Sequence, residues 1–209
     1  MKMPNDKRPL RRIGIMGGTF DPVHLGHIGV AEAAIEEARL DEIVFMPAYI
    51  QPFKQDRYTV DGEMRFKMLE LATIHNEKLK VSRWELEQET ISYTYDTISH
   101  FLKEDTVDKI FFLMGSDSLM KVETWHKGKD LLKTCSFVVG LRPTNDRDIV
   151  SACAERLRSE YGSEIILLEK PMLPISSTMI REYVSENKPI SGLVSPLVEE
   201  FIYKNELYI

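Results

Sequence analysis

The chain has 209 residues and a formal net charge of -6 at pH 7, with 43% hydrophobic and 29% charged residues. This length accommodates one domain with a sizeable core, and the composition is typical of a soluble globular protein. The acidic balance argues against a broad surface for nucleic acids or anionic membranes, although a local basic pocket would be enough for a small anion.

The cysteines and the apolar runs predict a soluble cytoplasmic protein. Cys135 and Cys153 form neither a CxxC pair nor a disulfide framework, so we expect reduced thiols. Residues 1–9 form a polar extension without a signal-peptide pattern, and the apolar runs are too short to span a membrane. We expect one domain over residues 10–209, which includes a helical C-terminal subregion over 171–209.

Short, continuous apolar runs alternate with segments of helical period. Continuous runs are typical of strands covered on both faces, and their alternation with helices implies right-handed crossovers in a parallel sheet. We therefore predict a doubly wound, Rossmann-like α/β fold with helices on both faces, in which ligands bind at the carboxyl ends of the strands. The predicted strands are Ile13–Met16, Ile43–Met46, Ile110–Met114, Phe137–Leu141 and Ile165–Leu168.

Helical spacing predicts the elements between and after these strands. The apolar stripes are Leu25, Ile28, Ala31, Ile35 and Ala38; then Met64, Met68, Leu71 and Ala72; then Tyr95, Ile98 and Leu102. The charged segment from Asp146 to Tyr161 predicts a surface helix. After Lys170, two short helices are expected around Thr178–Val184 and Pro196–Tyr203, the second beginning with a serine cap and a proline.

The segment after the first predicted strand reads Gly17-Gly18-Thr19-Phe20-Asp21-Pro22-Val23-His24-Leu25-Gly26-His27. Its two glycines let the backbone turn sharply and approach a ligand closely. Asp21-Pro22 predicts a helix start, with a capping carboxylate followed by proline. His24 and His27 are three residues apart, so both are expected on one face of the opening turn. Because a helix N-terminus favours anions, this segment predicts a phosphate site.

A second candidate anion site lies in Ile175-Ser176-Ser177-Thr178-Met179-Ile180-Arg181. Hydroxyl side chains at a helix start are often only caps, and that interpretation stays open here. Arg181 favours an anion, because a cation in the first turn opposes the helix dipole and no glutamate completes a capping box. A phosphate held by hydroxyls, N–H groups and the guanidinium would remove this conflict.

With both motifs in view, the chain resembles the nucleotidylyltransferase superfamily, and within it the bacterial nicotinate-nucleotide adenylyltransferases. The first motif matches the superfamily's (His/Thr)-x-Gly-His element, and the second matches its Ser-Ser/Thr-x-x-Arg helix start. The other matching stretches are Arg65 with residues 68–72, Ser92-Tyr93-Thr94 with Asp96-Thr97, Gly115-Ser116-Asp117-Ser118, Trp125, Arg142-Pro143 and Leu207-Tyr208.

This resemblance implies an enzyme that transfers the adenylyl group of ATP to nicotinate mononucleotide. The products would be nicotinate adenine dinucleotide and pyrophosphate, in a step of NAD biosynthesis. A phosphate oxygen of the mononucleotide would attack the α-phosphorus of ATP directly, without a protein nucleophile. The resemblance also implies Mg²⁺ carried mainly by ATP, since this ion often binds phosphates and water in place of a protein cage. We expect no metal site made by the protein alone.

The resemblance also implies a role for particular residues. The implied catalytic residues are His24 and His27 at the reacting phosphate and Arg181 at the leaving pyrophosphate. The implied ATP-binding residues are Gly17, Gly18, Thr19, Phe20, Gly115, Asp117, Ser177, Thr178 and Arg181. The implied substrate-binding residues are Thr94, Trp125 and Lys54. An indole can stack on a pyridinium ring, and a threonine hydroxyl can receive a carboxylate. For Trp125, a partly buried core aromatic stays an alternative.

Three positions depart from the family pattern. The loop usually written Pro-Pro-His-Lys/Arg reads Gln51-Pro52-Phe53-Lys54, which lacks the imidazole. His126 follows Trp125 where a tyrosine is usual, and Thr90-Ile91 replaces the Gly-Pro that often precedes Ser-Tyr-Thr. The first two departures bear on substrate discrimination more than on the reaction.

Other functions stay open at this stage. An adenylyltransferase for nicotinamide mononucleotide or pantetheine phosphate, or a cytidylyltransferase, would share both motifs. A non-catalytic nucleotide sensor would retain the fold but would not need both His24 and His27. A zinc site at this pair lacks further ligands nearby, and the missing GxGxxG pattern disfavours a dehydrogenase. The sequence leaves the oligomeric state open, a homo-oligomer included.

Several residues outside these motifs are expected to have ordinary structural roles. The Glu85–Glu89 stretch is interpreted as a solvated face, and His75 and His100 as surface residues. Trp84 is interpreted as a partly buried core aromatic, because nothing in the sequence connects it to the two motifs.

Overall fold

The computed structural model describes residues 11–52, 59–103, 107–142 and 146–209. Within these ranges, six strands form one parallel sheet in the order β3-β2-β1-β4-β5-β6. The strands are β1 (Arg12–Gly18), β2 (Glu42–Pro47), β3 (Leu79–Val81), β4 (Lys109–Gly115), β5 (Ser136–Gly140) and β6 (Ile165–Leu167). This topology confirms the predicted doubly wound fold, and the strand order reverses between β1 and β4.

β3 is a strand that the apolar runs do not predict. It has three residues and pairs with β2 at the edge of the sheet. Leu79 is buried and Lys80 is exposed, so β3 lacks the continuous apolar pattern of a strand covered on both faces.

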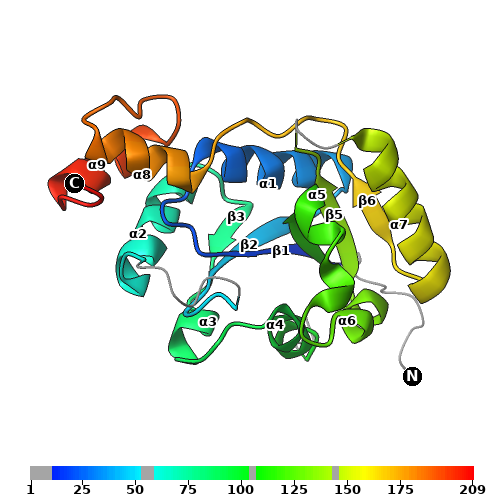
Figure 1. The fold of residues 1–209 in the computed structure, drawn as a ribbon. Helices are drawn as coiled ribbons and strands as arrows, with labels where there is room; N and C mark the ends of the chain where they lie inside the picture. Colours follow the sequence, from blue (N-terminus) through cyan, green and yellow to red (C-terminus); the bar gives the residue numbers. More distant parts are fainter. Residues whose placement is uncertain (1–10, 53–58, 104–106, 143–145) are drawn as a thin grey trace, which may run out of the picture.

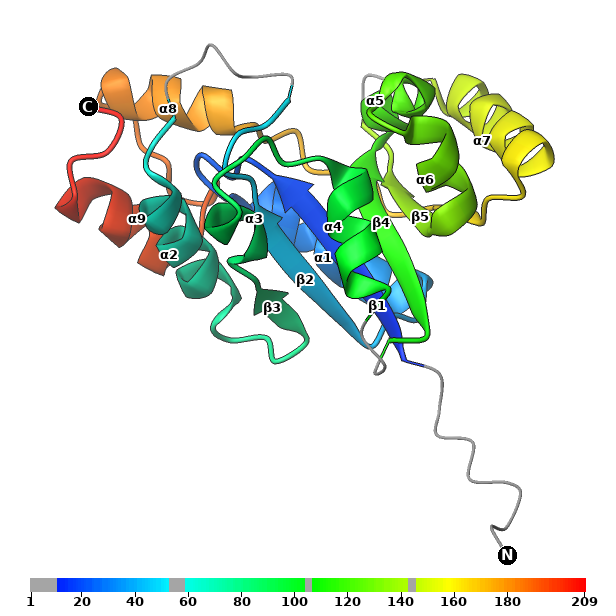
Figure 2. The same ribbon diagram turned by 90° about the horizontal axis from the view of Figure 1, so that it is seen from below.

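Helices cover both faces of the sheet (Figure 1). One face packs against α1 (Leu25–Glu37), α2 (Gly62–Thr73), α8 (Ser177–Ser185) and α9 (Pro196–Lys204). The other packs against α4 (Thr94–Phe101), α6 (Gly128–Thr134) and α7 (Arg147–Tyr161). The short elements α3 (Trp84–Glu87), α5 (Ser116–Leu119) and η1 (Val122–Thr124) lie in the connections. Figure 2 shows α4 and α6 in front of the sheet and α1 behind it.

The two-sided cover explains why the strands are continuously apolar. Along β4, Phe111 and Leu113 belong to the core on the α1 side, whereas Phe112 and Met114 belong to the core on the α4 side. Successive side chains of a strand point to opposite faces, so both sets must be apolar when both faces are covered. The same alternation places Ile13 and Ile15 of β1 in the core on the α4 side.

The apolar stripes predict where the helices lie, but they predict less well which side chains of those helices are buried. Met64 and Leu102 belong to predicted stripes but are 36% and 40% exposed. Arg65 is buried instead, at 2% exposure. The C-terminal helices α8 and α9 confirm the two predicted short helices, and the Ser195 hydroxyl accepts a hydrogen bond from the Val198 N–H at the start of α9.

The predicted charged surface helix is confirmed as α7. The Asp146 carboxylate accepts a hydrogen bond from the Asp148 N–H at its start, and Gly162, with a φ of 71°, follows its end. Only three of its residues are buried, namely Val150, Ala154 and Leu157. Across the described ranges, every helix is too short or too polar to cross a membrane.

The start of α6 depends on a glycine. A Cβ atom added at Gly128 would overlap the backbone carbonyl oxygen of Val122 in η1. By contrast, a Cβ atom at Gly29 in α1 would meet no heavy atom within 4 Å. The two glycines therefore form a matched pair for testing this close approach.

We expect Gly128→Ala to lower the free energy of unfolding by roughly 1–3 kcal/mol, because the backbone of η1 must move to admit the methyl group. Gly29→Ala should leave it unchanged or raise it by up to about 1 kcal/mol, since alanine favours a helix interior. Urea unfolding followed by circular dichroism measures both effects. Equal unfolding midpoints for the two variants would contradict the expectation.

Candidate functional site

The loop between β1 and α1 carries the first motif, and it folds differently from the prediction. Helix α1 begins at Leu25 with His24 as its N-cap, so the prediction that Asp21-Pro22 starts the helix is wrong. The Asp21 carboxylate points elsewhere, because its Oδ1 accepts a hydrogen bond of 2.7 Å from the Tyr208 hydroxyl. A buried carboxylate with partners in the core is not available to cap a helix.

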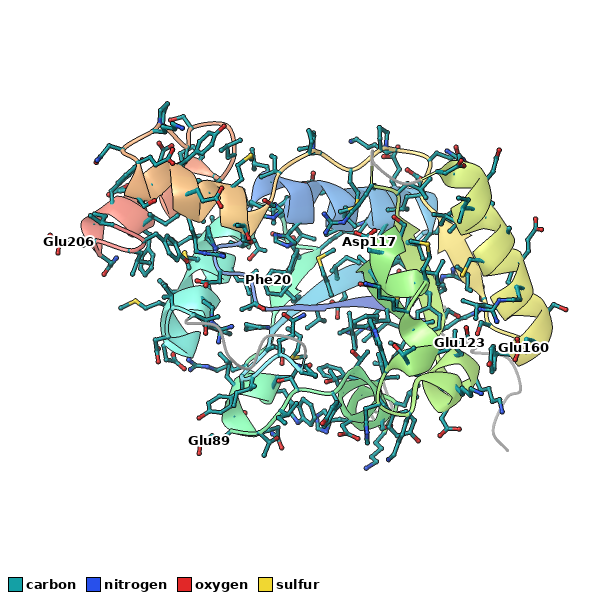
Figure 3. All side chains as sticks on the ribbon, in the orientation of Figure 1. Phe20, Glu89, Asp117, Glu123, Glu160 and Glu206 are labelled. Carbon is teal, nitrogen blue, oxygen red and sulfur yellow. The ribbon has the colours of Figure 1, made fainter. Side chains whose placement is uncertain are left out.

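His24 and His27 form a stacked pair at the start of α1. Their ring centroids are 3.7 Å apart and their planes are inclined by 27°. His27 Nδ1 accepts a hydrogen bond of 3.3 Å from the His24 N–H, and the Phe20 ring contacts the His27 ring at 5.0 Å. A Cβ atom at Gly26 would lie 2.9 Å from His24 Nδ1, so glycine lets this imidazole lie over the first turn. Figure 3 shows Phe20 beyond the end of β1.

Burial keeps His24 neutral. Its side chain is 7% exposed, and its buried Nδ1 has no hydrogen-bond partner within the described residues. Desolvation, together with the nearby positive charge of Arg142, lowers the pKa of His24 to about 4. Buried polar atoms in native proteins nearly always have a partner, so this nitrogen is a candidate for contact with a ligand.

The start of α8 packs directly on the loop that precedes α1. Ser176 is the N-cap of α8, since its hydroxyl accepts a hydrogen bond of 3.1 Å from the Met179 N–H. The Ser177 hydroxyl donates to the carbonyl oxygen of Pro22 at 2.8 Å. These contacts bring the starts of α1 and α8 together, as expected if both contribute N–H groups to one anion site.

Arg181 lies further along α8 than the predicted position in the first turn. It is the fifth residue of the helix, so its charge is not in the first turn, and its side chain reaches back toward the start. One guanidinium nitrogen donates to the carbonyl oxygen of Asp21 at 2.6 Å, and another to the Thr178 hydroxyl at 3.3 Å. Both partners are uncharged oxygens, and Arg181 forms no ion pair within the described part of the chain. Its charge is therefore not neutralised.

The end of β4 contributes Gly115, and α5 follows with Asp117 (Figure 3). Asp117 forms an ion pair with Arg142, with 2.8 Å between Oδ2 and Nε, and each side chain is 49% exposed. Arg142 follows β5, and its N–H donates to the Ser116 hydroxyl at 3.3 Å. Its charge also contributes to the low pKa of His24, so it belongs to the same site.

Arg142 is a residue of this site to which the sequence assigns no role. It enters only through the Arg142-Pro143 match to the family. A signal was present, because a cation that directly follows an apolar strand lies at the carboxyl edge of a parallel sheet. The sequence does not show that this edge also carries His24.

Thr94 and Trp125 come from neighbouring segments. Thr94 is the first residue of α4, and Trp125 directly follows η1, where its ring packs edge-to-face on Phe112 at 6.0 Å. The residues beside them touch, because the rings of Tyr93 and His126 lie 4.3 Å apart. The departure at His126 therefore places an imidazole against Tyr93.

The loop after β2 connects the two halves of the site. The Thr19 hydroxyl donates to the Gln51 side-chain oxygen at 2.7 Å. The Ser92 N–H donates to the carbonyl oxygen of Ile50 at 2.9 Å, and the Tyr49 N–H donates to the Ser92 hydroxyl at 3.0 Å. The loop thus joins the histidine segment to the segment that leads into α4. Lys54, together with the neighbouring Phe53, lies outside the described residues.

The interpretation of Glu85 as part of a solvated face is wrong. Glu85 is 6% exposed, and it accepts a hydrogen bond of 2.6 Å from the Thr97 hydroxyl of α4. Burial raises the pKa of this carboxyl. His100 is also not a simple surface residue, because its ring stacks on Trp84 at 4.5 Å. These contacts fix α3 against α4, behind the segment that contains Thr94.

The donors at this edge suit an anion better than a protein-held cation. The described residues contain no group of three or more histidine, cysteine, aspartate or glutamate side chains that could hold a metal ion. Asp21 is bonded to Tyr208, and Asp117 is paired with Arg142. What converges is two imidazoles, guanidinium groups, hydroxyls and the N–H groups of two helix starts, a set that favours phosphate.

Comparison with known proteins gives the site a family context. A cytidylyltransferase-like family model matches residues 15–183. A probable nicotinate-nucleotide adenylyltransferase of Thermoanaerobacter sp. (strain X514) is 41% identical over 200 residues, which cover 94% of each chain. A protein of the same name from Moorella thermoacetica is 40% identical over 198 residues, covering 94% of this chain and 91% of that protein.

A solved structure supports the fold. Plasmodium falciparum nicotinic acid mononucleotide adenylyltransferase complexed with NaAD has a TM-score of 0.77 to this chain. The two sequences are 22% identical, and the alignment covers 95% of this chain and 97% of the other. At this level of identity, the similarity concerns the fold.

The low pKa of His24 predicts a pH-dependent stability. His24 has an ordinary pKa of 6.5 when unfolded and about 4 when folded, so the unfolded chain binds more protons between these values. The contribution of neutral His24 is complete above about pH 6.5 and is lost as the pH falls toward 4, a change of roughly 3 kcal/mol. His24→Asn should lack this contribution.

Urea unfolding of the parent protein and His24→Asn at several pH values between about 4 and 7.5 measures it. His75→Asn, at an exposed position, controls for the loss of an imidazole as such. The same pH slope in the parent protein and His24→Asn would show that burial of His24 does not couple protonation to folding.

Proposed function

Because the chain belongs to the nicotinate-nucleotide adenylyltransferases of the cytidylyltransferase-like family, we propose that it transfers the adenylyl group of ATP to nicotinate mononucleotide. The products are nicotinate adenine dinucleotide and pyrophosphate, which makes the reaction a step of NAD biosynthesis. The observation that carries the chemistry is the meeting of the α1 and α8 starts around His24, His27 and Arg181.

The reaction is a single displacement at phosphorus. A phosphate oxygen of the mononucleotide attacks the α-phosphorus of ATP, a new P–O bond forms, and the bond to the bridging oxygen of the β-phosphate breaks. Pyrophosphate leaves with that electron pair. Such a reaction needs positioning and stabilisation of charge, which the hydrogen-bond donors of this site supply.

On the ATP side, His24 and His27 act at the reacting phosphate. A neutral imidazole offers one N–H donor, and an approaching phosphate raises the proton affinity of a buried histidine. His24 is therefore poised to strengthen its interaction as negative charge develops. Gly26 is required beside it, because a larger residue would push the imidazole away.

The leaving pyrophosphate is held by α8. The helix start offers backbone N–H groups and the hydroxyls of Ser177 and Thr178, and Arg181 supplies a cation whose present partners are uncharged. Arg142 adds a second cation, near His24. Together these groups neutralise charge on the side from which the leaving group departs.

The nucleoside of ATP is received by two loops. One wall is the backbone of Gly17 and Gly18 at the end of β1, together with Thr19 and Phe20 after it. The other is Gly115 at the end of β4 with Asp117 in α5, where the Asp117 carboxylate accepts hydrogen bonds from ribose hydroxyls. The ion pair of 2.8 Å with Arg142 fixes the position of this carboxylate at the end of the sheet.

The acceptor nucleotide lies on the α4 side. The Thr94 hydroxyl and the first N–H groups of α4 receive the nicotinate carboxylate. The half-buried Trp125 ring stacks on the pyridinium, a cation–π contact of roughly 0.5–2 kcal/mol. Lys54 remains a sequence prediction for the same substrate.

Mg²⁺ enters this proposal with ATP. The described carboxylates of the site, Asp21 and Asp117, already have hydrogen-bonding or ionic partners, so the residues fit an ion held by phosphate oxygens and water. When bound, the ion would neutralise phosphate charge. Orientation and hydrogen bonding remain the task of the histidines, α8 and the two loops.

His27→Ala should lower turnover by roughly two orders of magnitude or more, the scale for removing one preorganised transition-state donor. Release of pyrophosphate from ATP and nicotinate mononucleotide measures it. His75→Ala changes an exposed histidine away from the site and should retain parental turnover. Near-normal pyrophosphate release by His27→Ala would remove His27 from the proposed role.

The site should also favour nicotinate mononucleotide over nicotinamide mononucleotide, because the carboxylate accepts hydrogen bonds from the α4 start and the amide carries no charge. A paired assay of kcat/KM with the two acceptors at saturating ATP tests this. Equal or reversed values would overturn the choice of acceptor and leave adenylyl transfer itself intact.

A further inference from the structure

The C-terminal end of the chain reaches the ATP side of the site. Tyr208 is the penultimate residue, yet its hydroxyl donates a hydrogen bond of 2.7 Å to Oδ1 of Asp21, 187 positions away. Asp21 is 4% exposed and lies in the loop that leads to His24. The same oxygen accepts a longer hydrogen bond, of 3.4 Å, from the Val60 N–H. Tyr208 is therefore the nearer partner of a buried carboxylate oxygen.

Asp21 lies among cations that hold the same loop. Arg65 is buried and donates to the carbonyl oxygens of Val60 and Thr19, each at 2.8 Å. The charge of Asp21 acts on Arg65 through space. From the other side, Arg181 donates to the backbone oxygen of Asp21 at 2.6 Å. The loop is thus held by Arg65 and Arg181 through its carbonyl oxygens, and by Tyr208 through the Asp21 carboxylate.

The chain leaves α9 through two residues with left-handed backbone. Glu206, with a φ of 52°, ends the helix in a Schellman turn, and Tyr208, with a φ of 65°, follows it. Such conformations persist where surrounding contacts fix them. Leu207 and Tyr208 pack against the core beside α1, and the Leu207 N–H donates to the carbonyl oxygen of Ile202 at 3.0 Å. Burial raises the pKa of Tyr208, which keeps its hydroxyl a donor.

We propose that Tyr208 is a positioning residue of the ATP site, which holds the Asp21 carboxylate and thereby the loop that carries Phe20 and His24. This inference rests on the proposed function. Without the hydroxyl, the buried carboxylate oxygen loses its nearer donor, and Arg65 and Arg181 become its alternative partners. Withdrawal of Arg181 toward Asp21 would take a cation from the phosphates. Thr94 and Trp125 are anchored on α4 and η1, so the acceptor half is spared.

The test is Tyr208→Phe, which removes only the hydroxyl. A lost partner of a buried charged group corresponds to roughly a 10-fold rise in the KM for ATP and in the Kd for ATP measured by calorimetry. The KM for nicotinate mononucleotide should stay within about twofold. Tyr203→Phe removes the same group from an exposed tyrosine of α9 and should match the parent protein.

Asp21→Asn weakens the same hydrogen bond from the other side and should give the same ATP-selective change. In the double variant, the two effects should fall short of their sum, as expected for one shared contact. Thermal unfolding confirms that each variant is folded at the assay temperature.

The outcomes separate this inference from the proposed function. Unchanged ATP binding in folded Tyr208→Phe, or an equal rise of both KM values, would overturn the positioning role. If the parent protein fails to turn over nicotinate mononucleotide while Tyr208→Phe still weakens ATP binding in calorimetry, the proposed function fails and the positioning role stands.

Discussion

The site is shaped by the need to hold positive groups close together. Two helix starts, Arg65, Arg142 and Arg181 gather around the loops that follow β1, β4 and β5, and like charges in a low-dielectric environment repel one another. The protein offsets part of this with Asp21 beside Arg65 and Asp117 beside Arg142. Arg181 has only uncharged oxygens as partners within the described residues. The positive charge at Arg181 is thus left for an anion such as a phosphate to neutralise.

The charge state of His24 also limits the positive charge that this site has to hold. Burial, with the positive charge of Arg142 as the smaller cause, lowers the pKa of His24 to about 4 and keeps its imidazole neutral. Gly26 makes the burial feasible, since the ring of His24 occupies the space of a side chain there. In the proposed reaction, His24 would therefore meet the phosphate as a neutral donor, and the permanent charge would come from arginines.

The fold could be predicted from the sequence because it depends on local pattern, and the candidate site was placed by the same reasoning. Continuous apolar runs identify strands covered on both faces, and a glycine loop at the end of such a strand identifies the binding edge. The apolar runs did not predict β3, because an edge strand with an exposed Lys80 does not show that pattern. The burial of Asp21 and Glu85 could not be predicted for a different reason. Each buried carboxylate accepts a hydrogen bond from a hydroxyl of another segment, that of Tyr208 or of Thr97, and no local sequence pattern indicates this partner.

The same distinction explains how the two halves of the site are built. The proposed ATP half depends on long-range contacts, in which the last 39 residues fold back so that Ser177, Arg181 and Tyr208 fix the loop after β1. The acceptor half depends on α4 and η1, which are near in sequence, and Gln51 and Ser92 connect it to the first half through the loop after β2. We expect substitutions in the acceptor half to reach the loop after β1 only through the Thr19–Gln51 contact, because Ser177, Arg181 and Tyr208 hold that loop from another segment. This separation is consistent with a chain that departs from its family pattern at Phe53 and His126 while retaining both histidines and Arg181.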